Sequence, residues 1–303
     1  MKKILVLYYS QSGQLKKVVE NFTSQIDDEN ILIDYREIEP VKKYPYPWPF
    51  YEFFDEFPES VYLDGCEVNK IENVEDDYDL IILGYTIWFL SPSLPVTGFL
   101  KTQQAKKLFK NKPVITLIAC RDMWVMAQEK MKQLLKDIDA KLIDNVVLTD
   151  QGKSIYTFFT TPRWLLTGKK DSFAFFPPAG ISEEDIKNSS RFGARIKEQL
   201  LSCKFDGTKS LLKDLNAVSV NGKLIASEKI ATKSFKIWGK LIKLAGKKYS
   251  LNRKIVITLY SIFLITLILT LVPLNIFIRK LLSPFQKEKI KELERYFEQP
   301  SGK

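Results

Sequence analysis

The sequence has 303 residues, is 45% hydrophobic and carries a formal net charge of +10, with no histidine. The lack of histidine excludes Ser-His-Asp triads, Cys-His pairs and His-ligated metal sites. Proton transfer must therefore use Asp, Glu, Lys, Tyr, Cys, water or a cofactor. Cys66, Cys120 and Cys203 are too widely spaced for a metal or redox pair and form no disulfide framework. This cysteine usage, with no signal-peptide pattern at the start, favours a reducing compartment.

The charge is divided unevenly along the chain. Residues 1–150 hold 18 basic and 24 acidic groups, a net charge of −6, and residues 151–303 hold 28 and 12, a net charge of +16. The second half therefore favours an anionic partner, which is either phospholipid or nucleic acid. No recognised nucleic-acid-binding module is visible, so we predict membrane lipid as the partner and no nucleic acid.

The first element is an apolar run, Ile4–Tyr8, followed by a polar loop and by apolar residues at helical spacing from Leu15 to Phe22. A buried strand, a tight loop and a helix start point several N–H groups and the helix dipole at one spot, which suits a phosphate. The loop has neither Walker A nor G-x-G-x-x-G spacing, and an ordinary strand-to-helix turn remains the alternative. The predicted phosphate loop comprises Ser10, Gln11, Ser12, Gly13, Gln14 and Leu15.

Four further strand-like runs follow, with helical patterns between them. The strands are expected at residues 31–38, 79–84, 113–119 and 140–148, and helices at 96–101 and from Val125 to Ile138. This alternation predicts an α/β fold with a doubly wound, parallel five-stranded sheet in the order 2-1-3-4-5. The loops at 10–15, 85–93 and 120–124 should then meet at the carboxyl edge of the sheet.

Two aromatic stretches interrupt the pattern. Residues 44–58 contain Pro45, Pro47 and Pro49, which predicts no regular helix there. This stretch is either a rigid wall for an apolar ligand or a connection packed on the core. Residues 154–176 form a second aromatic insertion, interpreted as another wall of a substrate pocket. Ser182 then opens a capping-box pattern, which predicts a helix that runs to about Leu201.

The second and third loops carry Trp88 and Trp124, which can flank a planar ring or belong to the core. Ser10-x-Ser12-Gly13-x-Leu15 resembles the flavodoxin phosphate loop, with Leu15 in place of a final hydroxyl residue. The segment from Gly84 to Ser93 resembles the isoalloxazine-binding loop of flavodoxins and flavin-dependent quinone reductases, with Thr86 where proline is frequent. The resemblance implies a flavodoxin-like fold and an FMN cofactor, with further binding residues at Thr86, Ile87, Trp88, Phe89, Cys120, Met123 and Trp124.

A longer resemblance covers roughly residues 1–200. The stretches YYSQSGQ, YPYPWPF, WFLSPSLP, ACRDMW, NVVLTDQG and TPRWLLTGKKD resemble the bacterial dialkylresorcinol condensing enzymes of flexirubin-type lipid biosynthesis. Condensation of acyl thioesters normally uses a cysteine with histidine partners, so a chain without histidine is poorly suited to that step. We expect instead an oxidation that aromatises a dialkyl cyclohexanedione made by a partner ketosynthase. The catalytic candidates are Arg121, Asp122 and Cys120, acting on an apolar alkylated ring substrate.

The C-terminal region predicts a membrane attachment. Lys233–Lys254 carries eight basic residues and no acid, and Phe235, Trp238, Leu241, Ile242 and Ala245 share a helical stripe, as in interfacial helices. Residues 255–278 are 24 residues without a charge, long enough to span a bilayer. We predict a flavodoxin-like domain at 1–203, a basic linker and interfacial helix at 204–252, a transmembrane helix at 253–280 and a polar tail at 281–303. The domain is expected on the cytoplasmic face of the bacterial inner membrane, with a C-terminal single-pass anchor.

Two other functions fit the same sequence. One is an NAD(P)H-dependent quinone reductase of this fold, which would be reduced by NADPH and reoxidised by quinone. The other is a cofactor-free flavodoxin-like scaffold that tethers biosynthetic partners to the membrane, for which Leu15 and Thr86 are the supporting residues.

Overall fold

The structure is a computed structural model that describes residues 1–75, 77–202, 205–282 and 287–302, with 271–282 described by backbone alone. Cys203 lies outside the described residues. The central parallel sheet has the order β2-β1-β3-β6-β7, which confirms the predicted topology. Its strands are β1 (Lys2–Tyr8), β2 (Ile31–Glu37), β3 (Leu80–Tyr85), β6 (Pro113–Cys120) and β7 (Lys141–Thr149).

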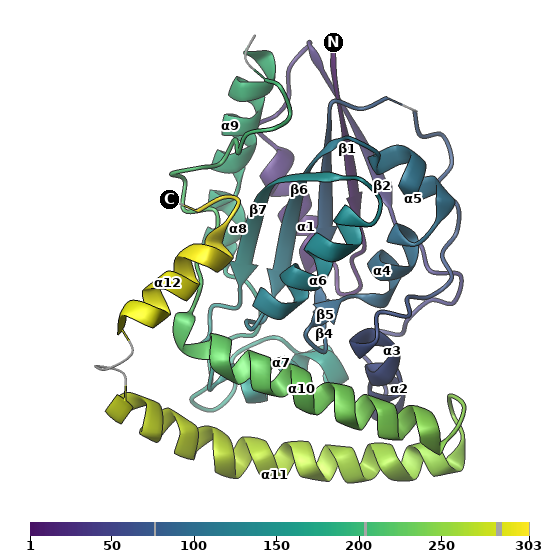
Figure 1. Ribbon diagram of the computed structural model, residues 1–303, viewed down its shortest axis with the longest axis vertical. Coiled ribbons are helices and arrows are strands. Elements are labelled where there is room, and N and C mark those ends of the chain that lie inside the picture. Colours follow the sequence, from purple (N-terminus) through teal and green to yellow (C-terminus); the bar gives the residue numbers. More distant parts are fainter. Residues whose placement is uncertain (76, 203–204, 283–286, 303) are drawn as a thin grey trace.

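The inner strands are apolar on both faces because helices cover both faces (Figure 1). Successive residues of β1 alternate between two apolar clusters, with Ile4 and Val6 on one side and Leu5 and Leu7 on the other. The first face is covered by α1 (Gln14–Thr23), α8 (Glu183–Asn188) and α9 (Ser190–Leu201). The opposite face is covered by α4 (Leu94–Leu100), α5 (Gln103–Phe109) and α6 (Val125–Lys136).

The expectation of no regular helix in residues 44–58 is wrong. This stretch contains α2 (Phe50–Asp55) and leads into α3 (Phe57–Val61). Pro49 is the N-cap of α2 and Pro58 lies in the first turn of α3, where no intrahelical N–H donor is lost. The prolines therefore mark helix starts. The second aromatic stretch likewise contains α7 (Thr157–Thr167).

The predicted capping box after residue 181 is present. Ser182 Oγ accepts a hydrogen bond from the Asp185 N–H at 3.0 Å and caps α8. The helical segment that follows is divided at Ser189 into α8 and α9. It covers α1 and completes the outer layer on that face of the sheet.

Three helices occupy the described part of the C-terminal region. The long pair α10 (Gly222–Ala245) and α11 (Leu251–Leu282) crosses below the carboxyl ends of the strands in Figure 1. Residues Leu251–Thr270 of α11 are long and apolar enough to span a membrane by length and composition. The final helix, α12 (Lys287–Glu298), lies back against the domain beside β7.

The outer edge of β7 is closed by polar contacts from later parts of the chain. The buried Asp144 carboxylate accepts hydrogen bonds from Ser210 Oγ at 2.6 Å and Ser301 Oγ at 2.8 Å. Ser301 Oγ also accepts from the Asn145 N–H at 2.6 Å. These contacts satisfy the edge strand and hold the last described residues on the domain.

Gly193 tests the packing of α9 on α1. A Cβ at this residue would lie 2.1 Å from the Phe22 carbonyl oxygen, which belongs to the backbone and cannot move easily. Glycine to alanine in a helix normally gains about 1 kcal/mol. We predict that Gly193→Ala instead lowers the free energy of unfolding, measured by chemical denaturation. The exposed neighbour Ala194→Gly is the control and should lose only the ordinary helix-propensity difference; a stabilised Gly193→Ala would contradict the packing.

Candidate functional site

Three loops meet at the carboxyl edge of the sheet. They follow the neighbouring strands β1, β3 and β6, and are the loop before α1, the segment 86–93 and the segment 121–124. The middle loop is a small hairpin of β4 (Ile87–Trp88) and β5 (Ser91–Pro92). In doubly wound folds, ligands bind at this edge, where neighbouring strands lead to helices on opposite faces.

The start of α1 has the geometry of an anion site. Gly13 is the N-cap residue of α1 and lies in the left-handed region, with a φ of 81°. Glycine has no side chain, so it does not cap the helix itself. An added Cβ at Gly13 would meet no atom of the described residues within 4 Å, so the loop is open on that side. Ser12 and Gly13 are exposed. The helix dipole and the backbone N–H groups at the very start of α1 therefore favour a negative group here.

The other residues of this loop have different roles. Ser10 Oγ accepts from the Lys16 N–H at 3.1 Å, and Gln11 Nε2 donates to the Pro45 carbonyl at 2.7 Å. Gln14 Nε2 is buried and has no hydrogen-bond partner among the described residues. Leu15 is buried in the core, so only its backbone can reach a ligand. The phosphate donors on offer are thus the loop N–H groups, the Ser12 hydroxyl and the Gln14 amide.

The two indoles are packed rather than open. Trp88 is 7% exposed, and its ring centroid lies 5.0 Å from Tyr44, 5.5 Å from Trp48 and 6.0 Å from Tyr9, all edge-on. Trp124 is 2% exposed in the same apolar cluster. Of the predicted ring-binding residues, Thr86, Ile87, Phe89, Cys120 and Met123 are part-exposed. The structure brings the predicted residues to one edge, but both indoles are buried in the apolar core cluster.

The backbone at this edge is strained. Phe89 and Leu90 have φ of 52° and 57° at the turn of the β4–β5 hairpin, and Met123 has φ of 53°. Non-glycine residues seldom adopt these values, which carry a cost that surrounding contacts must offset. Lys130 on α6 provides such contacts, because its Nζ donates to the Leu90 carbonyl at 3.0 Å and to Ser91 Oγ at 2.7 Å. Burial lowers the pKa of Lys130 to about 8.

Arg121 and Asp122 are held by the segment around α7. Arg121 Nε donates to Thr157 Oγ1 at 2.7 Å, and its guanidinium lies 4.0 Å from the centroid of the Phe158 ring. Asp122 accepts from Ser154 Oγ at 2.5 Å. Both charged groups are therefore fixed beside the third loop and not free on the surface. Burial lowers the pKa of Arg121 from its usual value, but a guanidinium remains charged at neutral pH.

Cys120 is a poor nucleophile in this setting. Burial, reinforced by the neighbouring Asp122 carboxylate, raises the pKa of its thiol well above the usual value. The neutral thiol is much less reactive than a thiolate. Cys120 is best described as a packing residue at the end of β6.

Glu228 was not found from the sequence. This α10 residue is 1% exposed, and its Oε1 accepts from the Met126 N–H at 2.7 Å, in the first turn of α6. Burial and the Asp122 charge raise its pKa to about 8, against the Met126 hydrogen bond and the Lys130 charge, which lower it. The available signal was an acid isolated among the lysines of this helix. Glu228 therefore places a carboxyl group with a raised pKa directly behind the third loop.

Neither a protein-family model nor a curated protein matches the sequence. Among solved structures, the chain is similar to a flavoprotein in complex with FMN from Lactobacillus acidophilus NCFM, with 22% identity over 48% of this chain and 93% of that one and a TM-score of 0.41. A flavodoxin, WrbA-like protein from Agrobacterium tumefaciens has 11% identity over 65% and 96%, with a TM-score of 0.39. A flavone reductase has 11% identity over 69% and 66%, with a TM-score of 0.38.

The chain has a flavodoxin-like fold. The strand order and the positions of the helices establish this fold. Structural similarities at these identities and TM-scores do not indicate a function. What the fold can bind depends on the residues at the carboxyl edge of the sheet.

The raised pKa of Glu228 predicts a pH dependence of stability. The ordinary value is 4.5 and the folded value about 8, so the folded state holds one more proton between these pH values and stability falls as pH rises through them. Glu228→Gln keeps the acceptor and removes the titration. We predict that its free energy of unfolding rises relative to that of wild type from pH 5 to pH 8, by a few kcal/mol in total, measured by chemical denaturation across this range. Exposed Glu184→Gln is the control, and parallel pH profiles of Glu228→Gln and wild type would contradict the burial.

Proposed function

We propose that this protein is an FMN-dependent oxidoreductase. The observation that carries the proposal is the open, glycine-capped N-terminus of α1, placed on the same sheet edge as the two other loops. That arrangement suits a phosphorylated ligand whose ring lies across neighbouring strand ends. The FMN complex among the structurally similar proteins belongs to another chain, and its cofactor is carried over here as part of the proposal.

The residues divide between two ends of the cofactor. Ser12, Gly13 and Gln14 would hold the phosphate, and the part-exposed Thr86, Ile87 and Met123 would lie against the ring. Bound FMN supplies the capacity to accept a hydride. The protein must hold the substrate ring, exclude water and move a proton.

We further propose that the substrate is a dialkyl cyclohexanedione, made by a partner ketosynthase and converted into a dialkylresorcinol at the membrane. Aromatisation would remove a hydride from one ring carbon, which bound FMN would accept, and a proton from the neighbouring carbon, which a protein base would take. Enolisation of the ring would then complete the resorcinol. Asp122, held by Ser154, is positioned as the base, and the Arg121 guanidinium can stabilise an enolate oxygen. The motif resemblance to dialkylresorcinol enzymes and the lack of histidine support this step over condensation.

A second candidate is a flavodoxin-like scaffold without flavin. The packing of Trp88 against three aromatic rings and the burial of Trp124 favour it, because neither indole is open to a ligand ring. Such a protein would hold biosynthetic partners at the membrane and carry out no redox step.

The phosphate site gives a direct test of FMN binding. Gly13→Asp places a carboxylate at the N-terminus of α1, and we predict that FMN affinity falls at least about tenfold, measured by fluorescence quenching. Gly13→Asn is the matched control, because it has the same shape, no charge and tolerance of positive φ. Riboflavin lacks the phosphate, so its affinity should be the same in both variants. Equal FMN affinity in the two variants would place the phosphate elsewhere.

The electron donor separates the proposed reaction from a quinone reductase. We predict that, in the absence of oxygen, an added dialkyl cyclohexanedione bleaches the flavin absorbance of the FMN-loaded protein and that added NADPH does not. Asp122→Asn should slow the bleaching while leaving FMN affinity unchanged, since the base acts on substrate. Rapid bleaching by NADPH, followed by recovery with quinone, would contradict the aromatisation and support the reductase.

A further inference from the structure

The start of α11 is fastened to the domain by a buried ion pair. The Arg253 side chain is 3% exposed, and its guanidinium donates to Asp55 at 2.5 Å and to Glu59 at 2.7 Å. One turn on, Ile257 and Tyr260 are buried, and the Tyr260 ring stacks on Phe57 at 4.4 Å. The inner face of α11 therefore belongs to the folded protein in its first three turns.

The opposite face of α11 is apolar and exposed. Its residues recur every three or four positions, which is one side of a helix. They are Leu251, Ile255, Leu259, Ile262, Ile265 and Leu269. Exposed apolar side chains in a continuous row of this length mark a surface that contacts another apolar phase or partner.

The neighbouring helix α10 has two apolar stripes, one packed on the protein and one exposed. Its inner stripe includes Phe235, Trp238 and Ile242, so most of the stripe singled out from the sequence packs on the protein, where Trp238 contacts Tyr260 and Phe263. The exposed apolar stripe is instead Ile230, Ile237, Leu241 and Leu244.

Basic residues border this apolar stripe of α10. By helical spacing, Lys229, Lys233, Lys236 and Lys240 lie along the side away from α11. The sequence has no acidic residue from Lys229 to Lys254. The surface therefore runs from a row of lysines, across the apolar stripe of α10, to the apolar stripe of α11.

The chain on the far side of α11 returns to the same domain. Glu294 of α12 accepts from the Gly222 N–H at the start of α10 at 3.0 Å, and Phe297 is buried in the core cluster. Ser301 binds Asp144 and Asn145 of β7. An α11 that crossed a bilayer would carry α12 to the other side and break these contacts.

We infer that α10 and α11 lie flat on an anionic phospholipid bilayer as an in-plane pair. The two apolar stripes enter the boundary between headgroups and acyl chains, and the lysine row binds lipid phosphates. Charge complementarity favours lipid over a second copy of the chain, because two copies would bring their lysine rows together. This arrangement replaces a single-pass anchor with attachment from one side.

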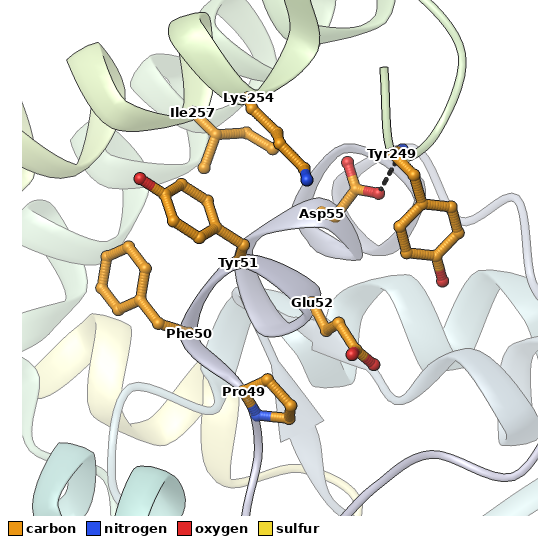
Figure 2. Close-up of a pocket in the computed structure, with 8 residues that line it drawn as sticks. All are labelled: Pro49, Phe50, Tyr51, Glu52, Asp55, Tyr249, Lys254 and Ile257. Atoms are coloured by element: carbon orange, nitrogen blue, oxygen red, sulfur yellow. Dashed lines mark hydrogen bonds between the residues drawn. The ribbon is translucent and has the colours of Figure 1, made fainter. Parts of the chain in front are cut away.

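The in-plane pair also lies at the candidate site. Phe89 of the β4–β5 hairpin contacts Phe57, which stacks on Tyr260 of α11. A cavity of about 250 Å³ lies between α2 and the start of α11, with Phe50, Tyr51, Lys254 and Ile257 among its lining residues. Figure 2 shows these side chains. Through the contacts of Phe57, the helix that meets the bilayer is thus joined to the hairpin of the candidate site. The inference deepens the proposed membrane role and does not depend on flavin.

Vesicle flotation of the full-length protein tests the surface. We expect binding to vesicles of phosphatidylcholine mixed with phosphatidylglycerol, and at least about tenfold weaker binding to phosphatidylcholine alone. Lys233→Gln combined with Lys240→Gln should remove most of this difference, and Ile237→Asp combined with Leu259→Asp should abolish binding. The matched control is Lys106→Gln on α5 with Lys110→Gln at the C-cap of the same helix. Equal binding to both vesicles, or a detergent-free dimer that ignores vesicles, would overturn the inference.

The topology is tested with epitope tags at both ends of the full-length chain. In sealed inner-membrane vesicles of one orientation, we expect an added protease to remove both tags or neither. Removal of one tag only would show that α11 spans the bilayer and would overturn the in-plane arrangement. Neither measurement reads the flavin, so a failure here leaves the FMN proposal to its own test.

Discussion

The N-terminus of α1 is the constraint on which the account depends. A parallel sheet directs every strand end to one edge, and β1 delivers a left-handed glycine and the unpaired N–H groups of a helix start to that edge. The hairpin after β3 and the loop after β6 have fixed positions relative to this point. A negative group bound at Gly13 would therefore bring the rest of its molecule across Thr86, Ile87 and Met123.

The parts of the fold that sequence reasoning predicted are those set by local pattern. The apolar runs gave the five strands and their order, and Ser182 marked a helix start, because burial and capping act within a few residues. The helices after Pro49 and Pro58 were missed because a proline breaks a helix interior but suits a first turn. The same reasoning placed the three loops together but left the environment of their side chains undetermined.

Long-range packing decided the rest. Trp88 is enclosed by Tyr44 and Trp48 from a segment some forty residues earlier, and Glu228 reaches α6 from a helix about a hundred residues later. No spacing rule connects such positions. The return of Ser301 to Asp144 is of the same kind, and it changes the interpretation of α11 from a segment judged by its own hydrophobicity to one fastened on a domain.

The central claim is that the carboxyl edge of the sheet holds FMN. The absorption spectrum of the full-length protein, purified in detergent and supplied with FMN before gel filtration, tests it most directly. The account predicts a yellow protein that retains flavin absorbance in the protein peak. A colourless protein peak that leaves all added FMN in the small-molecule fraction would contradict the account and favour a scaffold without a cofactor.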